Sequence, residues 1–181
     1  MKFVETDLKG AFIIEPAPVK DERGMFARIF CKRDFKVINH TKEFVQINLS
    51  SNIKKGTVRG LHFQQKPHAE IRLIQCIRGS VFDVMLDLRA NSVTFLKWFG
   101  TIISEENMKM TYIPEGFAHG FQTLEDHSQL LYHHTEYYTP NSGGGINPFD
   151  KEIGVRWPVP ISMCSDRDKN LPEITKEFNG M

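Results

Sequence analysis

The stretch Thr57–Gln64 gathers several residue types that can carry chemistry into eight positions. It contains a cation, a flexible glycine, an imidazole and an amide, at Arg59, Gly60, His62 and Gln64. If the stretch is a strand, alternation places the imidazole and the amide on one face and the apolar Leu61 and Phe63 on the other. An arginine near a histidine that titrates around neutral pH can bind an anion beside a proton-transfer group. A lone histidine in a strand is more often structural than catalytic, so a catalytic role for His62 needs support from the rest of the chain.

A second imidazole, His119, follows a proline and glycine turn and begins another predicted strand. On that strand it shares a face with Phe117 and Phe121, an aromatic setting that disfavours the charged imidazole. A further predicted strand carries Tyr132, which we expect to line the same cavity as His62. Its neighbours on that face are Leu130, His134 and Glu136.

These groups suit proton transfer next to a carbonyl. The available residues are His62, His119, Tyr132, Arg59, Arg72 and an acid from the turn Asp166–Asp168. A base can remove the proton alpha to a ketone, a cation can hold the enolate oxygen, and an acid can return a proton. Nucleophilic catalysis is less well supported, because no serine lies in a GxSxG motif and no cysteine has a nearby histidine pattern.

A metal site is the main chemical alternative. The chain resembles the cupins, whose first motif runs from a glycine through HxH to a glutamate and a glycine, and whose second motif is PxGxxH. The matching residues are Gly60, His62, Glu70 and Gly79 for the first motif, and Pro114, Gly116 and His119 for the second. Gln64 replaces the second histidine of HxH and is a poor ligand, although two histidines and a carboxylate can still form a facial triad for iron. We expect no bound metal.

Composition limits what these residues can bind. The 181 residues, 40% of them apolar, can bury one core, which predicts a single domain over residues 1–181. With 23 Lys plus Arg against 22 Asp plus Glu, no overall field favours nucleic acid or an anionic membrane, so anion recognition must be local. No apolar run approaches the roughly 20 residues of a membrane span, and residues 1–9 lack the apolar core of a secretory signal.

The missing span and signal predict a soluble, intracellular protein, and the cysteines point to the same location. Cys31, Cys76 and Cys164 are odd in number, far apart and outside any CxxC motif. This pattern argues against a disulfide framework and a zinc knuckle, and favours the reducing cytoplasm.

Short strands separated by glycine and proline turns must position the chemical groups. We expect strands over 3–15, 25–30, 44–50, 57–64, 71–77, 80–88, 95–104, 109–113, 117–124 and 129–139, with a short helix in 33–41. Residues 71–88 read as a hairpin with one buried face, turning at Arg78 and Gly79. Gly143–Gly145 predicts a flexible loop, either bordering a pocket or forming a surface linker. The series favours a mainly β jelly roll with its core at about 44–140, on which the N-terminal strands and the C-terminal segment pack.

Motifs along nearly the whole chain resemble, in order, those of the dTDP-4-dehydrorhamnose 3,5-epimerase family. They are Asp21-x-Arg23-Gly24-x-Phe26, Gln46-x-Asn48, Arg59-Gly60-Leu61-His62-x-Gln64, Asp83-Val84 with Asp87-x-Arg89, Pro114-x-Gly116-Phe117-Ala118-His119-Gly120-Phe121, Tyr132, Ile153-Gly154 with Trp157-Pro158, and Ser165-x-Arg167-Asp168. The resemblance implies a cupin-type jelly roll, a homodimer that shares strands, and no metal or organic cofactor. It also implies epimerisation of a nucleotide-linked 4-keto-6-deoxyhexose at the carbons flanking the ketone, within deoxysugar synthesis for surface polysaccharide or glycosides.

The resemblance also implies roles for individual residues. By position, His62 matches the general base, Asp168 the acid that orients it, and Tyr132 the proton donor on the opposite sugar face. Arg59 matches a diphosphate contact, and Arg23 matches an arginine that reaches the neighbouring subunit's site. The expected substrate contacts are Arg23, Phe26, Gln46, Asn48, Arg59, Arg72, His119 and Arg167.

The chain departs from the family pattern where substrate and nucleotide are expected. Arg72 stands where the family usually has a lysine, Arg28 and Gly143 stand where it has glutamates, and one residue is inserted between Gln46 and Arg59. The alternatives are therefore an epimerase acting at C3 or C5 only on a related CDP-, GDP- or dTDP-linked 4-keto sugar, a ketoisomerase, a metal-dependent cupin, and a sugar-binding or regulatory cupin without activity.

Overall fold

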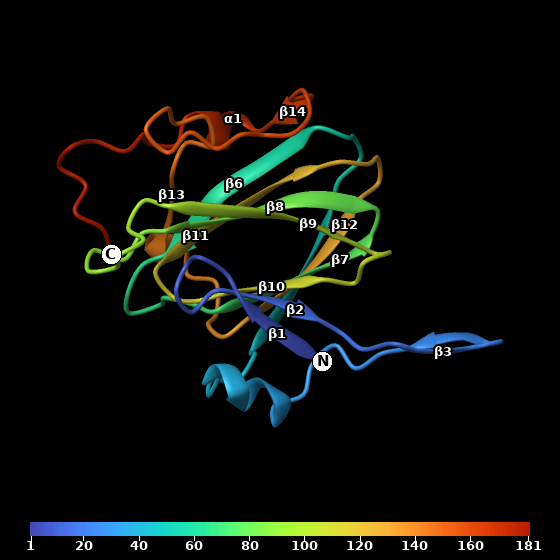
Figure 1. The fold of residues 1–181 in the computed structure, drawn as a ribbon. Helices are drawn as coiled ribbons and strands as arrows, with labels where there is room; N and C mark the ends of the chain where they lie inside the picture. The colour runs from blue at the N-terminus through green and yellow to red at the C-terminus, as the bar shows by residue number, and fades with distance from the viewer.

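The computed structural model describes residues 1–181 as two mainly antiparallel sheets that face each other (Figure 1). The first sheet has the order β1 (Lys2–Glu5), β2 (Phe12–Glu15), β10 (Met110–Ile113), β7 (Arg72–Arg78), β12 (Gln129–His134), β5 (Gln46–Ser51). The second has the order β13 (Gly143–Gly145), β6 (Thr57–Gln64), β11 (Phe117–Thr123), β8 (Ser80–Asp87), β9 (Trp98–Ser104), with β14 (Met163–Cys164) parallel to β6. The predicted mainly β, jelly-roll class is confirmed.

Outside these two sheets, only a few residues form regular secondary structure. They form the hairpin β3 (Val19–Asp21) and β4 (Gly24–Phe26), two 3-10 helices at Asp34–Ile38 and Pro140–Ser142, and the short helix α1 (Asp166–Lys169). The hairpin projects away from the body of the molecule, whereas α1 lies over β6 (Figure 1). None of the helices has the length and apolar character that a membrane span requires.

The main core fills the space between the sheets. Strand alternation sends Ile74 and Cys76 from β7 to meet Val81 and Met85 from β8, together with Phe121 from β11. A second cluster lies on the other face of β8, where Val84 and Leu86, with Leu88 just after the strand, pack with Leu61, Ile146 and Ile153. Strand β8 is therefore buried on both faces, and not on one as its sequence pattern predicted.

The predicted hairpin over residues 71–88 is wrong. Strand β7 pairs with β10 and β12, whereas β8 pairs with β11 and β9, so the two consecutive strands belong to different sheets. The chain changes sheet at Gly79, whose φ of +69° suits glycine. A turn signal between two apolar runs cannot distinguish a hairpin from an arch between sheets, because both need the same tight change of direction.

Several other expected elements differ in length or type. The single strand expected over 3–15 is two paired strands, β1 and β2, and the strand expected over 25–30 ends at Phe26 in β4. The helix expected in 33–41 is a 3-10 helix of five residues. Gly143–Gly145 is strand β13, which pairs with β6 and borders the cavity described below, so it is neither a flexible loop nor a linker. The expected Ser165–Asp168 turn is the capped start of α1.

Candidate active site

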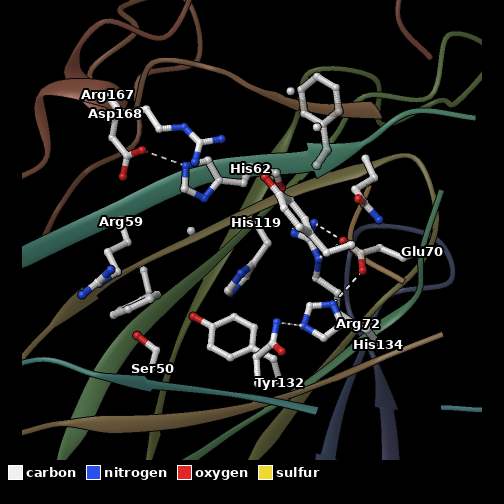
Figure 2. Close-up of a pocket in the computed structure, with 18 of the residues that line it drawn as sticks. Ser50, Arg59, His62, Glu70, Arg72, His119, Tyr132, His134, Arg167 and Asp168 are labelled. Atoms are coloured by element: carbon white, nitrogen blue, oxygen red, sulfur yellow. Dashed lines mark hydrogen bonds and ion pairs between the residues drawn. The ribbon is translucent and has the colours of Figure 1, made fainter. Parts of the chain in front are cut away.

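A cavity of about 410 Å³ opens between the two sheets, within the range of small-molecule sites (Figure 2). It brings together eight of the residues predicted for the site, which are Asn48, Arg59, His62, Arg72, His119, Tyr132, Arg167 and Asp168. Three predicted residues do not line it, which are Arg23, Phe26 and Gln46. Residues from positions 48 to 168 thus meet at one place, although they belong to six different elements.

A β-bulge brings Arg59 and His62 to the same side of β6. His62 pairs with His119 and Arg59 pairs with Phe121, so three steps along β6 match two steps along β11. Strict alternation would place Arg59 and His62 on opposite faces, but the extra residue turns both toward the cavity. The bulge is made possible by Gly60 and Gly120, since a Cβ on Gly120 would lie 2.6 Å from the carbonyl oxygen of Arg59.

His62 is oriented by Asp168. The Nε2 atom of His62 lies 2.8 Å from Oδ1 of Asp168, and the side chains are 36% and 6% exposed. Asp168 is held in turn by α1, because the hydroxyl of its N-cap residue Ser165 accepts from the Asp168 amide at 3.1 Å. A carboxylate only accepts hydrogen bonds, so Nε2 carries the proton and Nδ1 of the neutral ring offers a lone pair.

The carboxyl group of Asp168 stays ionised. Burial opposes the charge, but the hydrogen bond from His62, the Gly60 amide at 3.2 Å and the hydrogen bond with Ser165 outweigh it and hold the pKa of Asp168 below its ordinary value. The dyad therefore has the arrangement of an oriented imidazole base.

A second imidazole and carboxylate pair lies beside the first. Nε2 of His119 is 2.6 Å from Oδ1 of Asp83, whose other oxygen accepts from the Thr111 hydroxyl at 2.8 Å. Asp83 and Thr111 are fully buried. The ring of His119 also stacks near Phe121, with centroids 6.5 Å apart. The predicted aromatic setting is thus present, but alternation gave no sign of the buried carboxylate that His119 faces.

Tyr132 enters the cavity from the opposite sheet. His62 belongs to β6 and Tyr132 to β12, and Figure 2 shows the two side chains on opposite sides of the cavity with the phenol hydroxyl turned inward. The ring of Tyr132 lies edge-on to His119 at 5.7 Å and stacks on His134 at 6.0 Å. Burial, with the charge of Asp83, raises the pKa of Tyr132 above its ordinary value, so the phenol keeps its proton at neutral pH.

Glu70 and His134 are among the lining residues that were absent from the predicted set. Glu70 accepts from Arg72 and faces His134, and both Glu70 and His134 line the cavity. Strand alternation placed His134 on the face of Tyr132, and the cupin pattern marked Glu70 as an acid. No sequence pattern indicated that these two residues, 64 positions apart, would be paired.

The side chains that could bind a metal are instead paired with other residues of the chain. No three His, Cys, Asp or Glu side chains are grouped so that they could hold a metal ion. Of the cupin-type residues, His62 contacts Asp168, His119 contacts Asp83, and Glu70 contacts Arg72 and His134.

Three predicted contacts lie away from the cavity. Arg23 and Phe26 belong to the projecting hairpin, where the Arg23 side chain is 85% exposed and Phe26 is 78% exposed. Gln46 lies at the start of β5 and donates to Asn48, which does line the cavity, at 3.2 Å. Within one chain, then, the hairpin cannot serve the site formed by the two sheets.

The sequence matches one family over most of its length. A family model described as dTDP-4-dehydrorhamnose 3,5-epimerase matches residues 5–176. The dTDP-4-dehydrorhamnose 3,5-epimerase of Salmonella typhimurium is 43% identical over 176 residues, covering 97% of this chain and 91% of that protein. The enzyme of the same name from Shigella flexneri is 41% identical over 171 residues, covering 94% of each.

Solved structures agree with these sequence matches. The dTDP-4-dehydrorhamnose 3,5-epimerase of Bacillus anthracis, with TDP and PPi bound, superposes with a TM-score of 0.92 at 40% identity and covers 96% of this chain and 99% of that chain. The epimerase of Legionella pneumophila, in complex with dTDP-4-keto-L-rhamnose, gives a TM-score of 0.90 at 35% identity and covers 95% and 92%. Sequence and fold therefore point to the same relatives.

Proposed function

Since this chain belongs to the dTDP-4-dehydrorhamnose 3,5-epimerase family, we propose that it epimerises a dTDP-linked 4-keto-6-deoxyhexose at the carbons flanking the ketone. The observation that carries this proposal is the placement of an oriented imidazole and a protonated phenol on opposite sides of one cavity (Figure 2). Inversion of a carbon centre needs removal of a proton from one face and return of a proton to the other.

His62 removes the proton alpha to the ketone. Its Nε2 is tied to Asp168 at 2.8 Å, which leaves Nδ1 as the base. The imidazolium that forms is stabilised by the adjacent carboxylate, which stays ionised because its pKa is held low. A positioned base of this kind contributes about 10² to 10⁴ fold to the rate.

The electron pair left on carbon moves to the ketone oxygen and forms an enolate. Arg72 supplies the positive charge next to this oxygen, and its burial in the wall strengthens the interaction relative to water. Tyr132 then donates its phenol proton from the other side, and the carbon is inverted. At each carbon one proton leaves to His62 and one returns from Tyr132, and proton exchange with solvent then restores both side chains. The steps are redox-neutral, so they need no organic cofactor.

The nucleotide diphosphate binds through local positive charge. The whole chain has a net charge of only +1, but Arg59 and Arg167 both line the cavity close to His62 (Figure 2). Arg59 is held by Asn52, whose Oδ1 accepts from Nε at 2.7 Å, which leaves the terminal nitrogens for phosphate oxygens. We assign Asn48 and His119 as further substrate contacts, with Gln46 acting behind Asn48.

The second copy of the chain completes the site. The hairpin β3–β4 carries Arg23 and Phe26 away from their own cavity, and β5 ends the first sheet with Ile47 and Leu49 exposed by 61% and 58%. An exposed apolar edge strand is a surface for a partner, and a projecting hairpin suits exchange between two subunits. The proposed assembly is a homodimer in which Arg23 and Phe26 reach the neighbour's site. The three cysteines of each chain are unpaired, which suits the reducing cytoplasm.

Incubation in D₂O tests the function directly. The enzyme is mixed with the dTDP-, CDP-, GDP- and UDP-linked forms of 4-keto-6-deoxyglucose, with and without a chelator, and the products are followed by NMR. We expect deuterium at C3 and C5 and inversion at both carbons with the dTDP sugar, unaffected by the chelator. Absence of exchange with every sugar would contradict the proposal. Migration of the carbonyl to C3 would instead identify a ketoisomerase, and loss of turnover on chelation a metal-dependent cupin.

A further inference from the structure

Glu70 and His134, which have no role in the proposed proton transfers, form a buried array with Arg72. Figure 2 shows the three side chains together on the side of the cavity away from Arg59. Nε and Nη2 of Arg72 donate to one oxygen of Glu70 at 2.9 and 2.5 Å, and Nδ1 of His134 lies 2.6 Å from the other. Each of the three residues is less than 10% exposed.

The array continues as a chain of hydrogen bonds in both directions. On one side, Nε2 of His134 lies 3.3 Å from Nδ2 of Asn48, and Oδ1 of Asn48 accepts from Gln46 at 3.2 Å. Gln46 in turn accepts from the backbone amide of Tyr138 at 3.1 Å. On the other side, Nη1 of Arg72 donates to the carbonyl oxygen of His62 at 2.8 Å. The chain thus links β5, β12 and β7 of the first sheet to β6 of the second.

The backbone amide of Tyr138 determines which atom donates and which accepts in each hydrogen bond of this series. A backbone amide only donates, so the Gln46 side-chain oxygen accepts from Tyr138 and its nitrogen donates to Asn48. The Asn48 nitrogen must then donate to Nε2 of His134. This leaves Nδ1 of His134 as the nitrogen that carries hydrogen.

Glu70, at the other end of the series, also requires that Nδ1 of His134 carries the hydrogen. A guanidinium only donates, so Glu70 accepts from Arg72 and also from Nδ1 of His134. Burial opposes ionisation of Glu70, but the hydrogen bond from His134 and the charge of Arg72 outweigh it and keep the pKa of Glu70 below its ordinary value. Both ends require the neutral Nδ1–H form of His134, in which every group has a partner of the right kind.

Arg72 is left with one orientation. Its planar guanidinium has five N–H groups, of which two go to Glu70 and one goes to the carbonyl of His62. Fixing three donors of a rigid plane also fixes the directions of the other two. Arg72 lines the cavity, and no hydrogen bond within the chain uses these two donors.

We propose that Glu70 and His134 are positioning residues, which hold Arg72 so that its two remaining N–H groups meet the enolate oxygen. This inference rests on the proposed epimerase function and deepens it. A stabilising role alone does not require the Arg72 donors to point in one direction, because apolar residues of similar volume often stabilise a fold as well as a buried ion pair does. A defined direction for the Arg72 donors does account for it.

A double-mutant cycle tests whether Glu70 acts through Arg72. Glu70→Gln keeps the shape and removes the charge, and we expect kcat to fall about 10 to 100 fold with KM changed less than about threefold. In an Arg72→Met background the same substitution should lower kcat by less than about twofold, because the group it positions is gone. Equal losses in both backgrounds, or a change in KM alone, would overturn the proposal.

Substitutions at His134 provide an independent arm if Glu70→Gln does not fold. His134→Phe keeps a ring against Tyr132 and removes both nitrogens, so kcat should fall as in Glu70→Gln. His134→Asn restores a donor near the place of Nδ1 and should recover part of that loss. A phenylalanine variant with wild-type kcat, or an asparagine variant no better than phenylalanine, would contradict the positioning role.

The matched control is Asp87→Asn. Asp87 is a buried carboxylate that accepts from an arginine two positions along, Arg89, as Glu70 does from Arg72, but it lies outside the cavity. The Asp87→Asn substitution should lower the stability of the fold and leave kcat unchanged. A loss of kcat equal to that of Glu70→Gln would mean that any such pair is merely structural.

The tautomer of His134 can be read without turnover. Nitrogen-15 NMR of the wild-type protein should show the neutral Nδ1–H form, and Glu70→Gln should change it. This reading separates the two proposals. If no nucleotide sugar is turned over while His134 has the expected tautomer, the epimerase function fails. If the wild type is active and His134 is cationic or in the Nε2–H form, the positioning role fails.

Discussion

At the scale of single residues, His62 and Tyr132 divide the proposed reaction between two sides of the cavity. The imidazole is paired with a carboxylate and so is ready to accept a proton. The phenol has a raised pKa and so keeps the proton that it donates. Removal and return of the proton are therefore separate events on separate strands, and they respond differently to mutation.

Tyr132→Phe should separate these two events. Without the hydroxyl, the enolate still forms through His62, so exchange of deuterium into the substrate should continue at a reduced rate. Net inversion should fall by about 10² fold or more, as expected for loss of a positioned proton donor. NMR of the recovered sugar in D₂O measures both quantities in one experiment.

His62→Ala is the counterpart to that variant. It removes the base, so both exchange and inversion should be abolished. Exchange that survives in His62→Ala but is lost in Tyr132→Phe would mean that the roles of the two residues are reversed.

At the scale of elements, the close approach of β6 and β11 places the two imidazoles side by side. Gly120 meets Gly60 at the bulge, where a Cβ on Gly120 would lie 2.6 Å from Arg59 O and 2.7 Å from Leu61 Cδ2. His119, the residue before Gly120 on β11, is the direct partner of His62 on β6. Any separation of the strands here therefore moves both imidazoles.

Gly120→Ala should lower the free energy of unfolding by about 1 to 3 kcal/mol, because the methyl group overpacks the strand contact. Activity should also fall, since His119 and His62 shift apart. Chemical denaturation and steady-state kinetics measure the two effects. Gly143→Ala is the control for stability, because its Cβ would come no closer than 3.4 Å to a neighbouring atom. Equal stability of both variants would contradict the argument.

The connection between β8 and β9 depends on one buried carboxylate. Asp87 accepts from Arg89, Ser92 and Thr94 at 2.5–3.0 Å. Burial opposes ionisation, but these hydrogen bonds outweigh it and lower the pKa of Asp87 to about 2. In the unfolded chain this carboxyl group has a pKa of about 3.9. The carboxylate therefore stabilises the fold fully at pH values above about 3.9, and this contribution is lost as the pH falls toward 2.

Asp87→Asn should remove about 2 kcal/mol from the free energy of unfolding at pH 7. The difference between wild type and variant should shrink as the pH falls from about 4 to about 2. Urea denaturation across this range gives the measurement. Asp166→Asn, at an exposed ion pair in α1, should leave stability unchanged. A difference that is constant with pH would show that the Asp87 carboxyl is not ionised.

The sequence predicted the strands better than their partners. Alternation correctly placed Phe117, His119 and Phe121 together, because that strand is regular. It could not place Arg59 beside His62, because the bulge depends on close contact with a strand about 60 residues away. For the same reason it missed Asp83 behind His119, and read the arch at Gly79 as a hairpin turn. Local patterns specify local geometry, whereas pairings across the barrel depend on the whole fold.

At the scale of the whole molecule, one chain does not account for all of the predicted contacts. Arg23 and Phe26 extend from the body on the β3–β4 hairpin (Figure 1) and are strongly exposed. Within the chain, Arg23 pairs only with its near neighbour Asp21. A side chain in this position can act on a nucleotide sugar only if a second copy presents its own cavity to it.

Subunit mixing distinguishes a contribution in trans from one in cis. Arg23→Ala should lose most of its activity and His62→Ala all of it. When the two are unfolded, mixed in equal amounts and refolded, half of the dimers contain one subunit of each kind. Each such dimer has one complete site, because the intact His62 of one subunit meets the intact Arg23 of the other. Activity should then return to about a quarter of the wild-type value. A mixture no more active than the mean of its parents would place Arg23 outside the neighbour's site, and light scattering that shows a monomer would exclude the exchange altogether.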